Sequence, residues 1–252
     1  MPVPESPRLI YQRNPLKEVI CQVRFPVILR IDTERPVAFQ EQLREQYPFY
    51  QEKPIVAEVP PELARYAVGP FGGTAYEFAS ADGLWRVSLC RDFMALSSRA
   101  YVRWEDFERH LDLPLRVLLE QYRPAFFSRV GLRYVDVIKR SGLGLSERPW
   151  AELLRPEIVG ELGAADLRPN IGHAARELRL DLESKQAVMI RHGLANQGRE
   201  ECYVIDSDFY VEGPIEPGAV VGLLRGFSSR SGNLFRWCLR PILHEAMDPR
   251  SV

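Results

Sequence analysis

Two stretches of the chain resemble each other closely enough to constrain the whole fold. Residues 22–30 read QVRFPVILR and residues 131–139 read GLRYVDVIK, so that Arg24 matches Arg133 at the third position of each stretch. An aromatic residue follows each arginine, and a basic residue ends each stretch. This internal echo indicates two related halves, with each stretch in the first strand of its half.

A second, shorter echo favours the same division. Residues 91–95 read RDFMA and residues 207–211 read SDFYV, in the same order along the chain and at nearly the same spacing. We therefore expect one continuous domain made of two half-repeats, residues 1–126 with an N-terminal arm and residues 127–252. We also expect the two Asp-Phe pairs of this echo to lie at equivalent strand ends.

Both halves show the same succession of predicted elements. Alternating apolar residues predict strands, and apolar residues three or four positions apart predict helices. The first half predicts a strand at 16–31, a helix from Thr33 to Pro48, weak strands near 54–59 and 63–68, a turn at 69–73, strands at 74–80, 84–91 and 93–99, and a helix at 104–122. The second half predicts a strand at 127–139, one or two helices within 149–162, strands near 173–183, 186–194 and 201–211, and helices at 217–227 and 232–247. Pro114 lies inside the 104–122 helix, so we expect a kink or a break near residue 110.

This succession predicts an α+β fold, because meandering strands that end in a long helix are typical of antiparallel sheets. Each half would read strand, helix, meander, helix, and the two halves would share one curved antiparallel sheet packed by the long helices. Such a plan resembles the TATA-binding-protein saddle and the helix-grip folds. The likeness concerns topology, and topology alone does not give a function.

Composition and charge narrow the class of protein. The formal net charge of −1 disfavours a protein that coats nucleic acid, which would need a large basic excess. The N-terminal residues lack a basic segment followed by an apolar run, and no apolar stretch is long enough to cross a membrane. The four cysteines are far apart and form no CxxC motif, which favours reduced, buried thiols. We therefore expect a cytoplasmic protein without a membrane association.

Four charged residues form the most interesting pattern for a site. Asp206 and Asp208 are two residues apart on a predicted strand, and so are Arg129 and Arg133 within one strand face. Paired carboxylates can bind Mg²⁺ or Ca²⁺, and arginines can hold a phosphate or a carboxylate. The alternative is that these charges pair with each other across neighbouring strands. We treat them as a ligand-binding candidate and favour the structural network over a metal site.

Other candidate features have ordinary structural explanations. His173 and His192 lie on predicted adjacent strands and could approach each other, but none of the four histidines has HExxH spacing. Residues 228–232 read SSRSG and precede a predicted helix, where backbone N–H groups can hold an anion. A helix N-cap explains that segment fully. The sequence contains no GxSxG, P-loop or GxGxxG motif, so we assign no catalytic residue and no cofactor.

Several signatures resemble those of a known family. Residues 14–19 (NPLKEV) followed by Phe25-Pro26, and later residues 85–89, 101–107, 129–134 and 203–208 (WRVSL, YVRWEDF, RVGLRY and YVIDSD), are similar to the ordered signatures of a sporadically distributed bacterial and archaeal family of uncharacterised proteins about 250 residues long. The resemblance covers nearly the whole chain and implies no particular activity. A patchy distribution would suit an accessory gene of a mobile or defence cassette.

Three functions remain open at this point. The first is a non-catalytic cytosolic binding or regulatory protein that contacts a protein partner, encoded by a neighbouring gene. The second is a metal-dependent protein that binds or processes nucleotides or nucleic acids, with Asp206 and Asp208 as metal ligands and Arg129 and Arg133 on phosphate. The third is a small-ligand-binding protein with a cavity between the sheet and a long helix.

Overall fold

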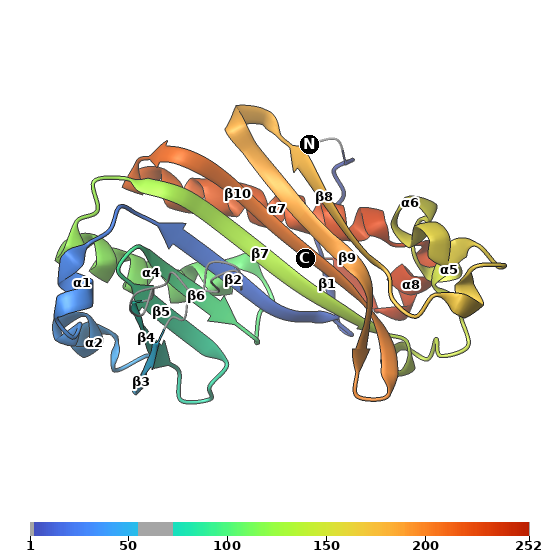
Figure 1. Ribbon diagram of the computed structural model, residues 1–252, viewed down its shortest axis with the longest axis horizontal. Helices are drawn as coiled ribbons and strands as arrows, with labels where there is room; N and C mark the ends of the chain where they lie inside the picture. The colour runs from blue at the N-terminus through green and yellow to red at the C-terminus, as the bar shows by residue number, and fades with distance from the viewer. Residues whose placement is uncertain (1–2, 55–72, 252) are drawn as a thin grey trace, which may run out of the picture.

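The computed structural model describes residues 3–54 and 73–251 and shows an α+β fold (Figure 1). Nine strands form one antiparallel sheet in the order β3-β4-β5-β6-β2-β7-β10-β9-β8, and β1 and β11 form a separate two-stranded sheet. The strands are β1 Leu9–Tyr11, β2 Leu16–Arg24, β3 Phe49–Pro54, β4 Thr74–Ala79, β5 Trp85–Cys90, β6 Phe93–Ser98, β7 Phe127–Lys139, β8 Ala175–Asp181, β9 Gln186–Gln197, β10 Glu200–Ile215 and β11 Pro249–Ser251. The helices are α1 Leu29–Thr33, α2 Val37–Leu43, α4 Trp104–Tyr122, α5 Trp150–Leu153, α6 Pro156–Val159, α7 Val220–Cys238 and α8 Pro241–Ala246, with short 3-10 turns between them.

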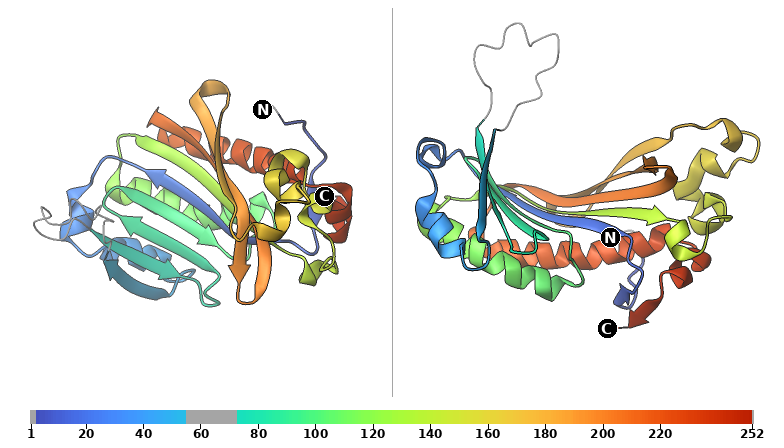
Figure 2. Two further views of the ribbon diagram at one scale, coloured as in Figure 1. Left: turned by 45° about the vertical axis from the view of Figure 1, so that its right-hand side comes forward. Right: turned by 90° about the horizontal axis from the view of Figure 1, so that it is seen from below.

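The large sheet is covered by long helices on one face only. Figure 2 shows α4 and α7 side by side beneath the sheet, which curves so that its other face is concave. We call this concave surface, which α4 and α7 do not cover, the open face. Strand alternation assigns side chains to the two faces, because successive residues of a strand point in opposite directions.

The middle of the sheet joins the two parts of the chain. β2 and β7 pair antiparallel, with Gln22 opposite Gly131 and Arg24 opposite Arg129. On the outer side of β2 lies β6, which precedes α4, and on the outer side of β7 lies β10, which precedes α7. The strands of residues 1–126 and those of residues 127–252 therefore form one continuous sheet.

Apolar side chains fill the layer between the sheet and the helices. In β7, Val130, Leu132 and Ile138 are fully buried, as their alternation predicts. They face a layer of buried residues from α4 and α7 that includes Phe107, Leu118, Leu224 and Phe227. Since these side chains pack at 0 % exposure, the layer that the small-ligand hypothesis required for a cavity is occupied by core.

The structure confirms the α+β class and most of the predicted elements, and it corrects several boundaries. The first strand ends at Arg24 instead of Ile31, because Pro26 cannot donate to a ladder and α1 begins at Leu29. β3 covers Phe49–Pro54, where we predicted no strand, and the strand predicted near 54–59 lies outside the described residues except for Pro54. The two predicted C-terminal helices at 217–227 and 232–247 are one long helix, α7, followed by α8, which begins at Pro241. The predicted strand near 63–68 and most of the turn at 69–73 lie outside the described residues.

The matching residues of the second echo, 91–95 and 207–211, do not occupy equivalent positions in the sheet. Phe93 pairs with Arg24 and its side chain lies on the open face, whereas Phe209 is fully buried on the helical face in the middle of β10. Asp92 lies in the turn before β6, while Asp208 is within a strand. The predicted equivalence of the two Asp-Phe pairs is therefore wrong, since a shift of one residue reverses the face of every side chain.

Pro114 does not break α4, which continues from Trp104 to Tyr122. Proline lacks the N–H that would bond to the carbonyl of His110, four residues earlier. The hydroxyl of buried Tyr47 donates to that carbonyl at 3.0 Å instead. A tertiary hydrogen bond thus satisfies the acceptor that the proline leaves free, and the break predicted near residue 110 is absent from this helix.

Candidate functional site on the open face

The four charged residues of the sequence candidate come together on the open face. Arg129 and Arg133 belong to β7, and Asp206 and Asp208 belong to the neighbouring strand β10. Their side chains alternate with buried residues such as Val130 and Leu132, so they point away from α4 and α7. The register of the two strands therefore creates the cluster, which we call the Arg-Asp cluster.

Two ion pairs hold the Arg-Asp cluster together. Arg133 makes a bidentate pair with Asp206, with Nε–Oδ1 and Nη2–Oδ2 distances of 2.7 and 2.6 Å. The Nη2 atom of Arg129 donates to Oδ2 of Asp208 at 2.8 Å. In the strand register Asp208 lies opposite Arg133, so both pairs run diagonally between the strands. The cross-strand network that we favoured over a metal site is the observed arrangement of these side chains.

Two neighbours fix the position of Arg129. A Cβ atom at Gly131 would collide with the Arg129 guanidinium, so the absence of a side chain there gives the guanidinium its place. The guanidinium also lies over the ring of Tyr210, 4.8 Å from its centroid. Gly131 and Tyr210 face each other in the register of β7 and β10. Arg129 is therefore held against the sheet, with 15 % of its side chain exposed.

Burial and charge act against each other at Asp208. Removal from water raises the pKa of Asp208, although the nearby guanidinium groups of Arg129 and Arg133 oppose this shift. Asp206 has only 9 % of its side chain exposed, whereas its partner Arg133 is 42 % exposed. The hydrogen bond to Asp206 raises the pKa of Arg133. Arg133 is thus the member of the cluster that presents a charged, ordered group to solvent.

A third carboxylate lies just beneath the cluster, on the helical face of the sheet. Asp136 in β7 is 6 % exposed and pairs in register with Ile205. Desolvation, followed by the charge of Asp206, raises the pKa of Asp136 to about 8. We did not single out this residue from the sequence. The sequence signal for a buried carboxylate is its place between Tyr134 and Ile138 on the strand face that also carries Val130 and Leu132. Asp136 is the single charged residue in this series.

Ion pairs continue across the open face on both sides of the cluster. Arg191 in β9 lies opposite Asp206 and pairs with Glu177 of β8 at 2.6 Å. In the other half of the sheet, Glu77 of β4 pairs with Lys53 at 2.8 Å and with Arg86 at 3.5 Å. Basic and acidic side chains therefore alternate over the face and leave it without a large excess of either charge.

The arrangement does not favour a metal ion. Within residues 3–54 and 73–251, no group of three or more His, Cys, Asp or Glu side chains is placed to hold one. Asp206 and Asp208 each bond to an arginine, whose positive charge opposes a cation at the same oxygens. His192 is buried and bonds to the Tyr203 hydroxyl at 2.8 Å, whereas His173 is exposed before β8. His173 and His192 therefore lie in different surroundings and do not form a metal-binding pair.

Comparisons of the sequence with protein families and with curated proteins found no match. Among the helices that the structure describes, none combines the length and the apolar character that a membrane crossing requires.

Proposed function

We propose that this is a non-catalytic cytoplasmic binding or regulatory protein whose open face contacts a protein partner encoded by a neighbouring gene. The observation that supports this most is a broad concave sheet surface on which basic and acidic side chains alternate in ion pairs. Nine strands spaced by about 4.8 Å give a surface roughly 40 Å across. The central strands β7 and β10, of 13 and 16 residues at about 3.3 Å per residue, add a length of roughly 40 Å along the strands. The face can therefore supply the roughly 800 Å² per partner that a specific protein interface buries.

The charge pattern favours a protein partner over a nucleic acid. A nucleic-acid surface needs an excess of basic groups that neutralise phosphates. On the open face each arginine of the cluster has a carboxylate at hydrogen-bond distance, and the chain has a net charge of −1. Fixed charges of both signs instead suit a partner with a complementary pattern, which gives specificity and a fast association.

We further infer that the two halves of the chain are related and together form a saddle of the TATA-binding-protein or helix-grip kind. The support is the order of strands in the nine-stranded sheet, where β6 lies beside β2 and precedes α4, and β10 lies beside β7 and precedes α7. A two-fold axis through the facing residues Gln22 and Gly131 would exchange β2 and β7. The same axis would exchange Arg24 with Arg133, as the first echo predicts, because each lies two residues beyond this pair.

The family remains part of the proposal. We propose that the chain belongs to the bacterial and archaeal family whose signatures it resembles, on the basis of the five ordered sequence signatures. For an accessory gene of a mobile or defence cassette, the products of neighbouring genes are the partners to test. The proposal names no catalytic residue and no cofactor.

The test exchanges charges without removing an ion pair. The double variant Glu177→Arg/Arg191→Glu keeps a cross-strand pair and the net charge but reverses the local pattern of the open face. The matched control, Arg116→Glu/Glu120→Arg, reverses an exposed i,i+4 pair on α4. We expect the open-face exchange to weaken binding of a purified neighbouring-gene product by at least about tenfold, and the control to leave it unchanged.

Two outcomes would count against the proposal. One is a partner that binds both double variants as tightly as the wild type, which would move the interface away from the open face. The other is a protein that binds none of the neighbouring products but hydrolyses a nucleotide or a nucleic acid in the presence of Mg²⁺ or Mn²⁺. That result would favour the metal-dependent alternative.

A further inference from the structure

A cavity of about 390 Å³ lies beside α4 and α7, on the opposite side of the sheet from the open face. Three segments form its walls: the N-terminal arm through Ser6 and Arg8, the start of α4 through Tyr101 and Trp104, and the outer side of α7 through Ser228 and Arg236. We call it the arm-helix cavity. Its volume is within the range of roughly 300–1,000 Å³ that is typical of small-molecule sites.

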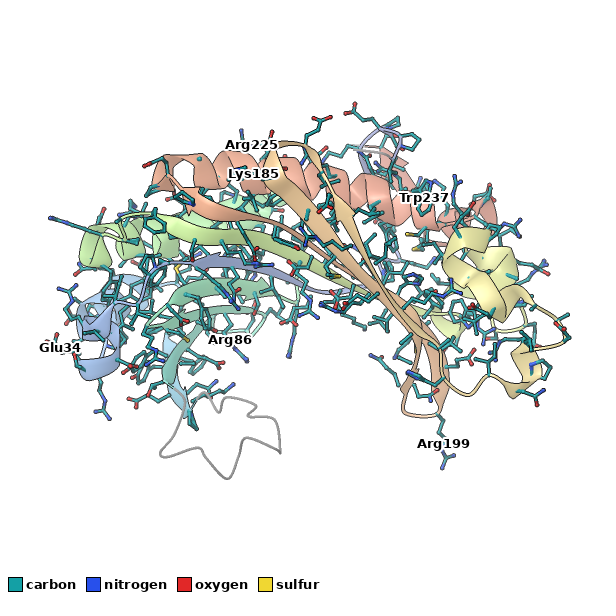
Figure 3. The ribbon with its side chains drawn as sticks, turned by 45° about the horizontal axis from the view of Figure 1, so that its top comes forward. Glu34, Arg86, Lys185, Arg199, Arg225 and Trp237 are labelled. Carbon is teal, nitrogen blue, oxygen red and sulfur yellow. The ribbon has the colours of Figure 1, made fainter. Side chains whose placement is uncertain are left out.

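Most of the charges around this cavity are already paired. Arg8 forms a bidentate pair with Glu105, and Arg225 donates to Glu108 at 2.8 Å. Figure 3 shows Arg225 on α7, where its side chain projects to solvent. These pairs lie at the rim, so they shape the entrance and add no free charge to the wall.

Arg236 is the exception, because it is a partly buried cation that pairs with no carboxylate within residues 3–54 and 73–251. Its Nη2 atom donates to the backbone carbonyl of Ser6 at 3.2 Å and to Oδ1 of Asn233 at 2.7 Å, and both acceptors are neutral. Its Nε atom is buried and has no acceptor among the described residues. Burial lowers the pKa of Arg236, as expected for a cation that has lost water and gained no counter-charge. A partly buried guanidinium whose acceptors are all neutral is stabilised by an anion.

Trp104 provides a second donor without a partner in the same wall. The indole is 5 % exposed, and its Nε1 atom is buried without an acceptor in the part of the chain that the structure describes. An unpaired buried N–H is costly, on the order of 1–3 kcal/mol, so such groups usually serve a ligand or a water. Two hydroxyl groups lie in the same wall, where Tyr101 contacts Ser228 at 3.2 Å.

We propose that the arm-helix cavity binds the oxyanion of a small molecule, a carboxylate or a phosphate, with Arg236 as its counter-charge. The hydroxyl groups of Tyr101 and Ser228 lie in the same wall and can donate to the oxyanion. Arginine suits this role because its planar guanidinium bonds carboxylate and phosphate in the same geometry. Ser228 and its neighbours were predicted to precede a helix, but they lie inside α7, so their hydroxyl groups and not a helix N-terminus contribute to the site.

Isothermal titration with two simple anions tests this site on the full chain. Sodium phosphate and sodium acetate are titrated at constant ionic strength, with sodium chloride as the reference. We expect saturation with one ion per chain below about 10 mM for at least one of the two anions. Saturation by only one of them identifies the chemistry as phosphate or as carboxylate.

Variants assign the binding to the cavity. Arg236→Gln should weaken binding by at least about tenfold. Arg116→Gln on α4 removes an exposed arginine paired with Glu120 and should leave the affinity unchanged. Arg236→Lys, which keeps the charge without the fork, should be intermediate and replaces Arg236→Gln if that variant does not fold.

A crystal of the wild-type protein soaked in the saturating anion gives an independent readout, with density expected beside the Arg236 guanidinium. The proposal is wrong if neither anion saturates the protein, if Arg236→Gln binds as well as the wild type, or if the density lies elsewhere. Each of these results leaves the proposed protein contact on the open face untouched, because the two sites share no residue.

Discussion

At the scale of single residues, β7 carries charge on both faces of the sheet. Arg129 and Arg133 meet Asp208 and Asp206 on the open face, and Asp136 points into the helical layer. The charges on the open face are paired and the one on the helical face is not, since no described side chain donates a hydrogen bond to Asp136. Its pKa is raised to about 8. The fold therefore holds this carboxyl group as the neutral acid over most of the physiological range.

The first prediction concerns the pH dependence that Asp136 confers. The unfolded chain titrates this group near pKa 3.9, whereas the folded protein does so at about 8. Between these values the folded state binds more protons, so the free energy of unfolding decreases as the pH rises, by up to about 1.4 kcal/mol per pH unit. Asp136→Asn removes this dependence. In urea unfolding between about pH 5 and pH 8, the variant should gain stability relative to the wild type as the pH rises.

The control for this measurement is Asp112→Asn, an exposed carboxylate on α4 that should leave the pH profile unchanged. A parallel pH dependence in the wild type and in Asp136→Asn would show that another group titrates in this window.

The second prediction concerns the more buried ion pair of the Arg-Asp cluster. Arg129→Met keeps the length of the side chain but leaves Asp208, already raised in pKa by burial, without its guanidinium. We expect a loss of about 1–3 kcal/mol in the free energy of unfolding at neutral pH. The loss should shrink near pH 4, where protonation of Asp208 removes the buried charge. Denaturant unfolding at both pH values checks this, and Arg116→Met, from an exposed pair, should cost below about 0.5 kcal/mol.

At the scale of elements, α4 shows how a helix remains continuous around a proline. The helix buries Phe107, Leu111 and Leu118 against the sheet, so its register is fixed on both sides of Pro114. The carbonyl of His110 loses its helical donor and receives the hydroxyl of Tyr47, which follows α2. The ring of His110 also stacks on Trp85 of β5, with centroids 3.7 Å apart. His110, four residues before the proline, thus ties α4 to two other parts of the first half.

The third prediction concerns the Tyr47 hydroxyl, which donates to the His110 carbonyl in place of the backbone N–H that Pro114 lacks. Tyr47→Phe leaves the His110 carbonyl without a donor and should cost about 1–3 kcal/mol of stability. In the Pro114→Ala background the cost should be smaller by about 1 kcal/mol, because the new backbone N–H can reach the same carbonyl. Thermal or urea unfolding of the four proteins of this double-mutant cycle measures the coupling. Strictly additive losses would mean that Tyr47 acts through packing alone.

At the scale of the whole molecule, the two halves share one sheet and one core. β2 and β7 pair from Leu16 to Arg24, and the cavity between the arm, α4 and α7 also draws on both halves. Without the other half, residues 1–126 would leave an edge of β2 unpaired, and residues 127–252 would leave an edge of β7 unpaired. The fold is therefore expected to unfold as one cooperative unit.

The fourth prediction tests that cooperativity with the tryptophans already present. Trp85 and Trp104 lie in the first half, and Trp150 and Trp237 lie in the second. One variant replaces the first pair with phenylalanine and the other replaces the second pair, so that fluorescence reports one half at a time. Within each variant, the fluorescence transition in urea should coincide with the circular-dichroism transition of the whole chain. A fluorescence transition separated from it would indicate halves that unfold independently.

The sequence by itself determined the elements whose pattern is local. The strand at 127–139 and the helix at 104–122 have the predicted bounds, because alternation and helical spacing are properties of neighbouring residues. The α+β class followed from the same succession of patterns. The sequence pattern also placed Arg129 and Arg133 on one strand face, and Asp206 and Asp208 on one face of another strand.

Only the tertiary structure decided which of these faces meet. That β10 lies beside β7, in a register that joins Arg133 to Asp206, depends on pairing between segments far apart in the chain. The continuity of α4 through Pro114 likewise depends on a distant partner, the hydroxyl of Tyr47. The same holds for the burial of Asp136 and for the neutral acceptors around the Arg236 guanidinium. Local propensity contributes a few tenths of a kcal/mol per residue, and burial in a shared core outweighs it.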